Sequence, residues 1–182
     1  VRTVCGNEVS EWCGVTTGRT HKEQFETSAW KECPIDAKKN RKYSLNRENP
    51  RIATKTNNGY CTVIGNTPLP QNKVTSWSIK VLNSKGNDGY GIYIGVAPSG
   101  IDQNENRTFE RCGWYFYCYD STLWSGLPHN YEGKAYELRK RKGKYVHTGG
   151  SVGVVMDTTK GELSFVVDCV SPGVAFDGIP LD

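Results

Sequence analysis

The stretch of sequence that decides the fold covers residues 149–176 and reads GGSVGVVMDTTKGELSFVVDCVSPGVAF. Apolar side chains alternate with small or polar ones over residues 152–157 and again over residues 162–167. A period of two is typical of a strand with one buried face. The residues between the two runs, 158–161, are polar and contain a glycine, which suits a tight turn. The stretch therefore predicts an antiparallel hairpin, followed by a third strand, that covers one side of a core.

Runs with the same period lie upstream, at residues 75–82, 91–96 and 112–119. The chain has 182 residues, of which 20 are Gly, 8 are Pro, 10 are Tyr and 5 are Trp. This composition suits short strands joined by many turns. Thr20 followed by Glu23 forms a capping-box pattern, which allows one short helix over residues 21–32. We therefore predict an all-β fold with at most this N-terminal helix.

Motifs along the chain resemble those of one known family. Residues 73–82 read KVTSWSIKVL, residues 91–97 read GIYIGVA, and residues 111–114 read RCGW before an aromatic run. With the GELSF and GVAF of the first stretch, they resemble the strand motifs of SPRY domains in the same order. Residues 43–55, YSLNRENPRIATK, resemble the PRY-type extension, in which an Asn-Pro pair precedes a strand. The resemblance implies an antiparallel two-sheet β-sandwich, a concanavalin-like jelly roll, that holds another protein.

The resemblance also implies how the chain is divided. We expect a SPRY-like domain over residues 40–182 and an N-terminal extension over residues 1–39 that packs on the sandwich. Family members continue after GVAF with two further strands. We therefore expect the last one or two strands to follow Asp182, or to be supplied by the extension or a partner. Where many members have a turn ending in Gly, this chain has Asp168 and Cys169. Because Cys disfavours a positive φ, we expect a different or wider turn there.

The cysteines favour a reducing compartment. Their number is odd, no Cys-x-x-Cys pair occurs, and their spacing resembles no disulfide framework. We therefore predict reduced thiols, no structural disulfide and an intracellular, cytoplasmic location. Cys5, Cys13, His21 and Cys33 lack the paired spacing of a zinc site, so we predict no metal and no cofactor. The seven cysteines are Cys5, Cys13, Cys33, Cys61, Cys112, Cys118 and Cys169.

No sequence pattern indicates catalysis or membrane insertion. His21, His129 and His147 are far apart in the sequence, and no serine lies in a Gly-x-Ser-x-Gly elbow. A pair of carboxylates of the glycosidase type stays open, since the sequence selects none. No apolar run approaches the roughly 20 residues that span a bilayer. We predict that the chain is not an enzyme and has no membrane partner.

Two long connections, residues 98–111 and 121–144, show no clear strand pattern, and the predicted binding surface combines the first with the aromatic loop over residues 119–131. Long connections in a compact sandwich more often carry a functional surface than serve only as linkers. The resemblance implies that the first connection contributes to the partner pocket. Trp77 and Trp114 fall in strand patterns and are predicted to be core residues. Aromatic rings on loops are typical of binding hot spots; the alternative is that they plug the end of the sandwich. The candidate binding residues are Ile101, Phe109, Tyr119, Asp120, Trp124, His129 and Tyr131.

A basic cluster accounts for the formal net charge of +4, and its members are Arg139, Lys140, Arg141, Lys142 and Lys144. A solvated loop tip is the simplest interpretation, and an acidic protein or a nucleic-acid backbone are the alternatives. Nucleic acid is disfavoured because the stacking aromatics of RNA-binding domains are missing. A lectin-like sandwich with Trp124 and Tyr131 as sugar platforms is another alternative. The leading prediction is a non-catalytic protein-interaction module, an adaptor that can belong to a larger protein or assembly.

Overall fold

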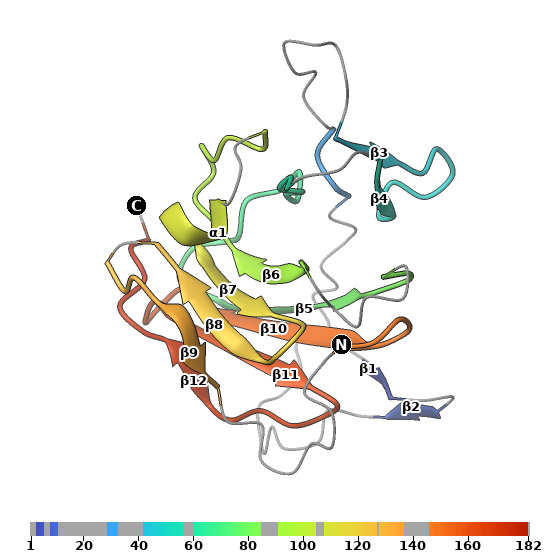
Figure 1. Cartoon of the computed structure of the whole chain (residues 1–182). Coiled ribbons are helices and arrows are strands. Elements are labelled where there is room, and N and C mark those ends of the chain that lie inside the picture. The colour runs from blue at the N-terminus through green and yellow to red at the C-terminus, as the bar shows by residue number, and fades with distance from the viewer. Residues whose placement is uncertain are drawn as a thin grey trace.

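Two antiparallel sheets of four strands each form the body of the molecule (Figure 1). The computed structural model describes residues 3–5, 8–10, 29–32, 42–56, 60–84, 91–104, 108–126, 128–136 and 146–181. One sheet has the order β12-β11-β10-β5 and the other the order β6-β7-β8-β9. The first contains β5 (Val74–Lys80), β10 (Ser151–Asp157), β11 (Glu162–Val167) and β12 (Val174–Phe176). The second contains β6 (Tyr93–Val96), β7 (Trp114–Tyr117), β8 (Thr122–Ser125) and β9 (Glu132–Ala135).

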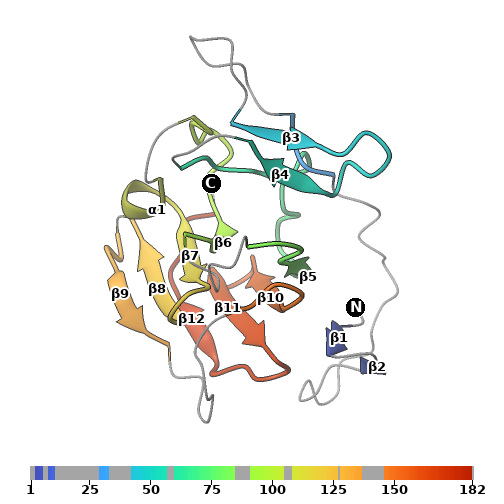
Figure 2. The same cartoon turned by 45° about the vertical axis from the view of Figure 1, so that its right-hand side comes forward.

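The other described elements are short. They are β1 (Thr3–Cys5), β2 (Glu8–Ser10), β3 (Tyr43–Leu45), β4 (Ala53–Lys55) and the helix α1 (Thr108–Arg111). The β3–β4 hairpin lies at the top of both cartoon views, beyond β6 and away from β12 (Figure 2). No helix in the described part of the chain is long and apolar enough to cross a membrane. The predicted all-β, two-sheet architecture with almost no helix is confirmed.

The first sheet follows from the alternation in the sequence. β10 lies between β5 and β11, with Val154 opposite both Trp77 and Phe165. Val154 and Phe165 are fully buried, and Trp77 packs against the same core from a partly buried position. The turn after β10 is anchored to β5, because the Thr158 hydroxyl accepts the backbone N–H of Lys73 at 2.9 Å. The hairpin predicted from residues 149–176 is therefore confirmed.

The second sheet shows the same alternation, but with aromatic side chains on both faces. Trp114 and Phe116 of β7 belong to the core between the sheets. Tyr115 and Tyr117 alternate with them along the strand, so they point to the opposite, outer face. Alternation therefore divides the aromatic run over residues 114–117 between the two faces of the sheet. Both outward tyrosines are nevertheless buried, at 7% and 8% exposure, because other segments cover them.

The core lies between the inner faces of the two sheets. It continues beyond the strands to Val81, Val146 and Ile179, which pack against the strand residues. The predicted core position of Trp114 is confirmed, at 7% exposure. The largest fully buried side chains of this core cluster are Phe116, Phe165, Phe176, Leu123 and Leu163.

The N-terminal helix predicted over residues 21–32 is wrong at its end. Trp30 forms an antiparallel bridge with Gly65 instead of a helical turn. Its backbone N–H donates to the Pro50 carbonyl at 3.1 Å, and that of Lys31 donates to Ile64 at 2.8 Å. These long-range partners replace the carbonyl four residues earlier that a helix would use. Residues 21–28 of the predicted helix lie outside the described residues.

Two further predictions about connections need correction. Residues 121–144 are not one irregular connection, because they contain β8 and β9. The turn at Asp168 and Cys169 is not wide, since Val167 and Val170 on either side exchange backbone hydrogen bonds of 2.9 and 3.0 Å. Both turn residues have positive φ, 48° and 62°. The two-residue hairpin geometry requires this conformation, and here it prevails over the steric cost of a Cys side chain.

The prediction of no disulfide is wrong at Cys169, which is disulfide-bonded. An odd number of cysteines excludes only the pairing of all seven, so one bond is compatible with the count. Disulfides are rare in reducing compartments, and this bond therefore weighs against the intracellular location predicted from the sequence. Cys61, Cys112 and Cys118 are thiols.

Candidate functional site

The outer face of the second sheet carries a stack of three parallel rings. The ring of Tyr93 from β6 lies between those of Phe109 from α1 and Tyr117 from β7. The centroid distances are 3.8 and 4.4 Å, and the planes differ by 8° and 7°. Tyr93 and Tyr117 are opposite each other in the register, which brings their rings together on one side of the sheet. The stack therefore joins the end of the 98–111 connection to the sheet.

Trp124 of β8 crosses this stack at a right angle. Its ring centroid lies 5.6 Å from that of Phe109, 5.9 Å from Tyr93 and 6.3 Å from Tyr117. All three pairs are edge-to-face contacts, with planes 82–85° apart. The two predicted binding segments thus meet through Phe109 and Trp124. The prediction that Trp124 lies on an exposed loop is wrong, since it is a half-buried strand residue.

Two further tyrosines extend this cluster. Tyr60 makes an edge contact with Phe109 at 5.4 Å, and Tyr119 contacts Tyr117 at 5.9 Å. Tyr119 is 42% exposed, so it forms the open end of the cluster. We call this set of contacting rings the aromatic face. Its members are Tyr60, Tyr93, Phe109, Tyr117, Tyr119 and Trp124.

Hydrogen bonds connect Trp124 to Asp120, another candidate binding residue from the sequence. The Trp124 Nε1–H donates to the Thr122 hydroxyl at 2.9 Å, and this hydroxyl donates to Asp120 Oδ1 at 2.7 Å. The backbone N–H of Thr122 also donates to the same Asp120 oxygen, at 3.1 Å. The indole and the carboxylate are therefore held together through one side chain.

Burial raises the pKa of the Tyr93 phenol above its ordinary value, so the group stays neutral well beyond physiological pH. Desolvation raises its pKa, and the nearby Tyr117, Tyr60 and Asp120 groups act in the same direction. Tyr93 also shares a side-chain hydrogen bond with Tyr117, whose hydroxyl accepts the Gly91 N–H at 3.4 Å. The aromatic face therefore has a polar edge of uncharged phenols beside one carboxylate.

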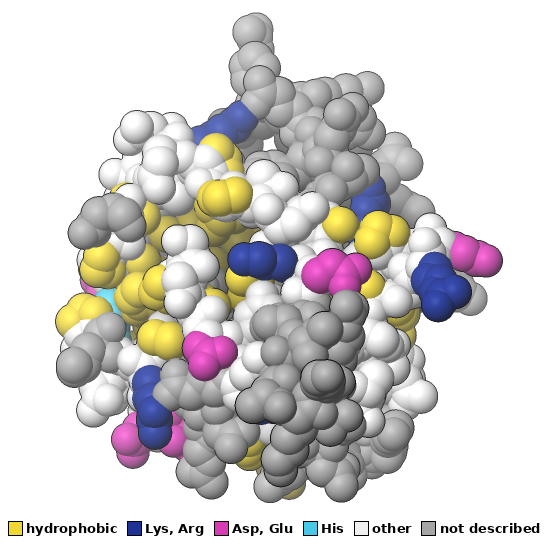
Figure 3. Space-filling model, turned by 90° about the horizontal axis from the view of Figure 1, so that it is seen from above, with side chains coloured by type: hydrophobic (Ala, Val, Ile, Leu, Met, Phe, Trp, Pro, Cys, Tyr) yellow, Lys and Arg dark blue, Asp and Glu magenta, His cyan; other side chains and the backbone are white. Residues whose placement is uncertain are grey.

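The 98–111 connection is held against this face by the segments before β5. The Thr62 N–H donates to the Gln103 carbonyl at 3.1 Å, and Lys42 Nζ donates to the Asn104 carbonyl at 2.5 Å. The Tyr43 hydroxyl lies 3.0 Å from Gln103 Oε1. Ile101 is half-buried within the connection. Seen from above, hydrophobic side chains gather in a hollow on the side where α1 lies, with charged groups around it (Figure 3).

His129 and Tyr131 lie apart from the aromatic face. His129 Nδ1 accepts the Trp114 Nε1–H at 3.0 Å, so Nε2 carries the proton and donates to the Asp177 carbonyl at 2.6 Å. The ring of Tyr131 stacks on Phe176 at 5.4 Å, and Lys134 Nζ lies 4.0 Å over its centroid. These contacts agree with the alternative interpretation of the aromatic residues, in which their rings fill the end of the sandwich and do not bind a partner. They also occupy the Tyr131 ring, which argues against its use as a sugar platform.

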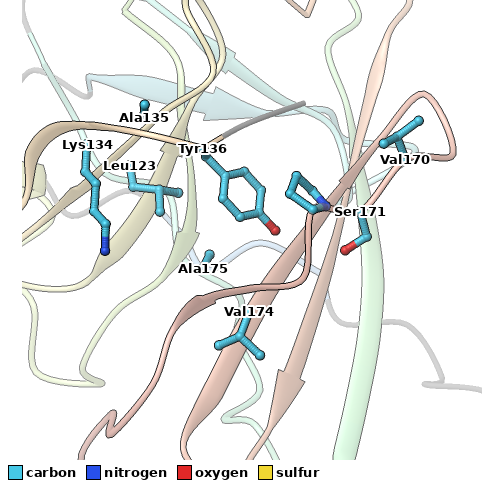
Figure 4. Close-up of a pocket in the computed structure, with 9 residues that line it drawn as sticks. Leu123, Lys134, Ala135, Tyr136, Val170, Ser171, Val174 and Ala175 are labelled. Carbon is cyan, nitrogen blue, oxygen red and sulfur yellow. The ribbon is translucent and has the colours of Figure 1, made fainter. Parts of the chain in front are cut away.

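A pocket of about 470 Å³ lies between the edge strands β9 and β12. Tyr136 stands at its centre, between Leu123 and Ser171 (Figure 4). Burial raises the pKa of Tyr136, and its neutral hydroxyl donates to the Gly173 carbonyl at 2.6 Å. The pocket contains none of the candidate binding residues predicted from the sequence. Its remaining lining residues are Lys134, Ala135, Val170, Pro172, Val174 and Ala175.

Sequence reasoning missed three residues of the aromatic face, Tyr60, Tyr93 and Tyr117. Tyr93 had a usable signal, because it alternates with Ile92 and Ile94 and so occupies the outward position of a strand. The basic cluster at residues 139–144 lies outside the described residues. Within the described ranges, no group of three or more His, Cys, Asp or Glu side chains is placed to hold a metal ion.

Comparison with known proteins places the chain in one family. The family model of the SPRY domain matches residues 74–182, which is more than half of the chain. A search of curated proteins found no match. The matched range begins at β5 and includes both four-stranded sheets, whereas residues 43–55, with their PRY-like motif, lie before it. The motifs, the two-sheet sandwich and the family model agree, and the chain belongs to the SPRY domain family.

Proposed function

We propose that this chain is a non-catalytic module that binds a partner protein through the aromatic face. SPRY domains are generally protein-interaction modules. The observation that carries the proposal is the connected ring cluster on the outside of the second sheet. Most outward positions of a sandwich are polar, whereas here Tyr93, Tyr117 and Trp124 occupy three of them.

The rings suit a binding surface because they are rigid before a partner arrives. Trp124 is fixed by its bond to Thr122, and Tyr93 is held between Phe109 and Tyr117. Ordering a side chain on association costs about 0.5–1.5 kcal/mol, so rings that are already ordered reduce the cost of binding. Tyr and Trp are also the residues most enriched in binding hot spots.

The module would act as a recognition arm, an adaptor within a larger protein or assembly. The contacts that hold the 98–111 connection, from Thr62 and Lys42, keep one border of the surface in place. Tyr119, 42% exposed, supplies ring area at the open border. A partner segment that lies across the face would contact both borders.

Affinity capture with quantitative mass spectrometry tests the proposal, followed by titration of the captured partner. Tyr119→Ala removes the exposed ring without opening the core, and Leu82→Ala is the control, since Leu82 is 54% exposed and outside the face. We expect Tyr119→Ala to weaken binding at least about tenfold, which corresponds to about 1.4 kcal/mol. Equal binding by both variants would contradict the proposal.

A further inference from the structure

The turn between β7 and β8 carries a carboxylate that no described cation neutralises. Asp120 Oδ1 accepts two hydrogen bonds from Thr122, which fix the side chain in place. No Lys, Arg or His of the described residues forms an ion pair with it. The residue is half-buried. A fixed carboxylate in partly desolvated surroundings attracts a positive charge more strongly than one in bulk water.

An aromatic surface lies directly beside this carboxylate. The Thr122 hydroxyl connects Asp120 to Trp124 Nε1. Tyr119, the neighbour of Asp120 in the chain, exposes its ring and packs against Tyr117. The face of an aromatic ring carries negative potential and attracts cations, with Trp the strongest of the natural side chains. The carboxylate and the rings therefore favour the same kind of ligand.

The strand next to Trp124 leaves this area open and adds a second negative charge. Gly133 of β9 has φ of 78°, and a Cβ there would lie 3.6 Å from Trp124 Cζ2. Because glycine stands at this position, residue 133 adds no side chain over that part of the ring. Glu132 is opposite Trp124 in the register, is exposed, and forms no ion pair with a described residue.

We propose that Asp120, Trp124 and Tyr119 form a receptor for a cationic side chain, Arg or Lys, of the partner's segment. The inference rests on the proposed function and specifies the chemistry of what the aromatic face binds. The carboxylate pairs with the ammonium or guanidinium group, and the rings contact its apolar stem. A guanidinium can lie flat on an indole while it donates to a carboxylate, which gives Arg the better fit.

The same charges disfavour other ligands. An acidic or phosphorylated segment would meet the Asp120 and Glu132 carboxylates, and like charges in contact are repelled. A purely apolar segment would remove water from the Asp120 carboxylate without offering it a new partner. This desolvation costs free energy. Charge complementarity therefore favours a basic segment for this part of the face.

The test uses the whole chain and needs no partner. The probe is N-acetyl-arginine methylamide, compared with the lysine and citrulline analogues, and it is titrated while backbone and indole N–H signals are followed by NMR. We expect saturable shifts of the Trp124 indole and of residues 119–122 with arginine or lysine. The neutral citrulline analogue should give shifts at least tenfold weaker at equal concentration. The tighter of the two cations identifies the preferred side chain.

Asp120→Asn is the decisive variant, because an amide oxygen can still accept both bonds from Thr122. We expect it to weaken probe binding at least tenfold. Asp157→Asn is the matched control, since Asp157 accepts the same two bonds from Thr159, at 2.5 and 2.9 Å, but lies at the end of β10 in the first sheet. Equal shifts with citrulline, no shifts at all, or unchanged binding by Asp120→Asn would each overturn the inference. If the cation binds while Tyr119→Ala leaves partner capture intact, the proposed function fails and the cation site stands.

Discussion

The outer faces of the two sheets differ in the size of the side chains that they present. On the first sheet, the outward positions of β10 and β11 include Gly153, Val155, Ser164 and Val166, which are opposite one another in pairs. These side chains are small or medium-sized and lie outside the core cluster. On the second sheet, four of the six corresponding positions of β6, β7 and β8 are aromatic, namely Tyr93, Tyr115, Tyr117 and Trp124, and the other two are Gly95 and Thr122.

This difference separates the residues that stabilise the sandwich from the residues that are available to a binding partner. The inner faces are alike, since both sheets contribute fully buried side chains such as Phe116 and Phe165. A large ring on an outer face is stabilised only if something removes it from water. On the second sheet, α1 and Tyr60 do so in part through Phe109, and Tyr119 stays exposed. The remaining open area is what a binding partner would cover.

The largest expected effect is on the inner face. Phe116→Ala should lower the free energy of unfolding by about 3–5 kcal/mol, because it leaves a cavity where the ring contacts Tyr136 and Phe165. Urea unfolding followed by tryptophan fluorescence measures this change. The control is Val166→Ala on the outer face of the first sheet, with an expected loss below about 1.5 kcal/mol. Similar losses for the two variants would contradict the division into inner and outer faces.

The second effect concerns the aromatic face, where stability and binding should change together. Trp124→Ala removes three ring contacts and the bond to Thr122, so we expect a loss of about 2 kcal/mol in stability. A loop position would have predicted almost no change. We also expect partner binding to weaken by about 2 kcal/mol or more. Thermal unfolding and titration with the captured partner measure the two quantities.

Val155→Ala is the comparison on the other outer face. It should cost less than about 1.5 kcal/mol in stability and leave partner binding unchanged, since Val155 lies on the other sheet. An equal loss of affinity in both variants would place the binding surface elsewhere. If Trp124→Ala loses stability but keeps its affinity for the partner, the aromatic face stabilises the fold and does not bind the partner.

The third effect lies where the two sheets are joined at the end of the sandwich. His129 connects Trp114 of the second sheet to Asp177, which follows β12 of the first. His129→Ala should cost about 2 kcal/mol, because the buried Trp114 Nε1–H loses its acceptor. His129→Asn keeps an oxygen near the position of Nδ1 and should recover part of this loss in urea unfolding. No recovery would mean that ring packing, rather than the hydrogen bond, stabilises this junction.

The sequence predicted the strands well and the site only in part. Alternation is local, so five strands were found within two residues of their observed ends, for example β10 and β11. Trp124 was misplaced because the four residues of β8 are too few to show a period. The contact of Phe109 with Tyr93 joins residues from different elements, and no local pattern encodes it. The tight turn at Cys169 also depends on strand pairing rather than on residue preference.

The smallest expected effect is at the polar end of β10, where Asp157 begins the turn to β11. Its Oδ1 accepts the Thr159 hydroxyl at 2.5 Å and the Thr159 N–H at 2.9 Å. The hydroxyl bond is the main reason that the pKa of this carboxyl lies below its usual value, and the Lys160 charge adds to it. Because the group is close to solvent, we expect a contribution below about 0.5 kcal/mol.

The sign of this contribution fixes its pH dependence. A carboxyl whose pKa is lower in the folded state stabilises the fold above its unfolded value of about 3.9, and this stabilisation is lost as the pH falls through the folded value. Wild type should therefore be slightly more stable than Asp157→Asn at pH 6, and the difference should shrink towards pH 2. Urea midpoints at the two pH values measure it. A difference that grows on acidification would show that the ionised Asp157 destabilises the turn between β10 and β11.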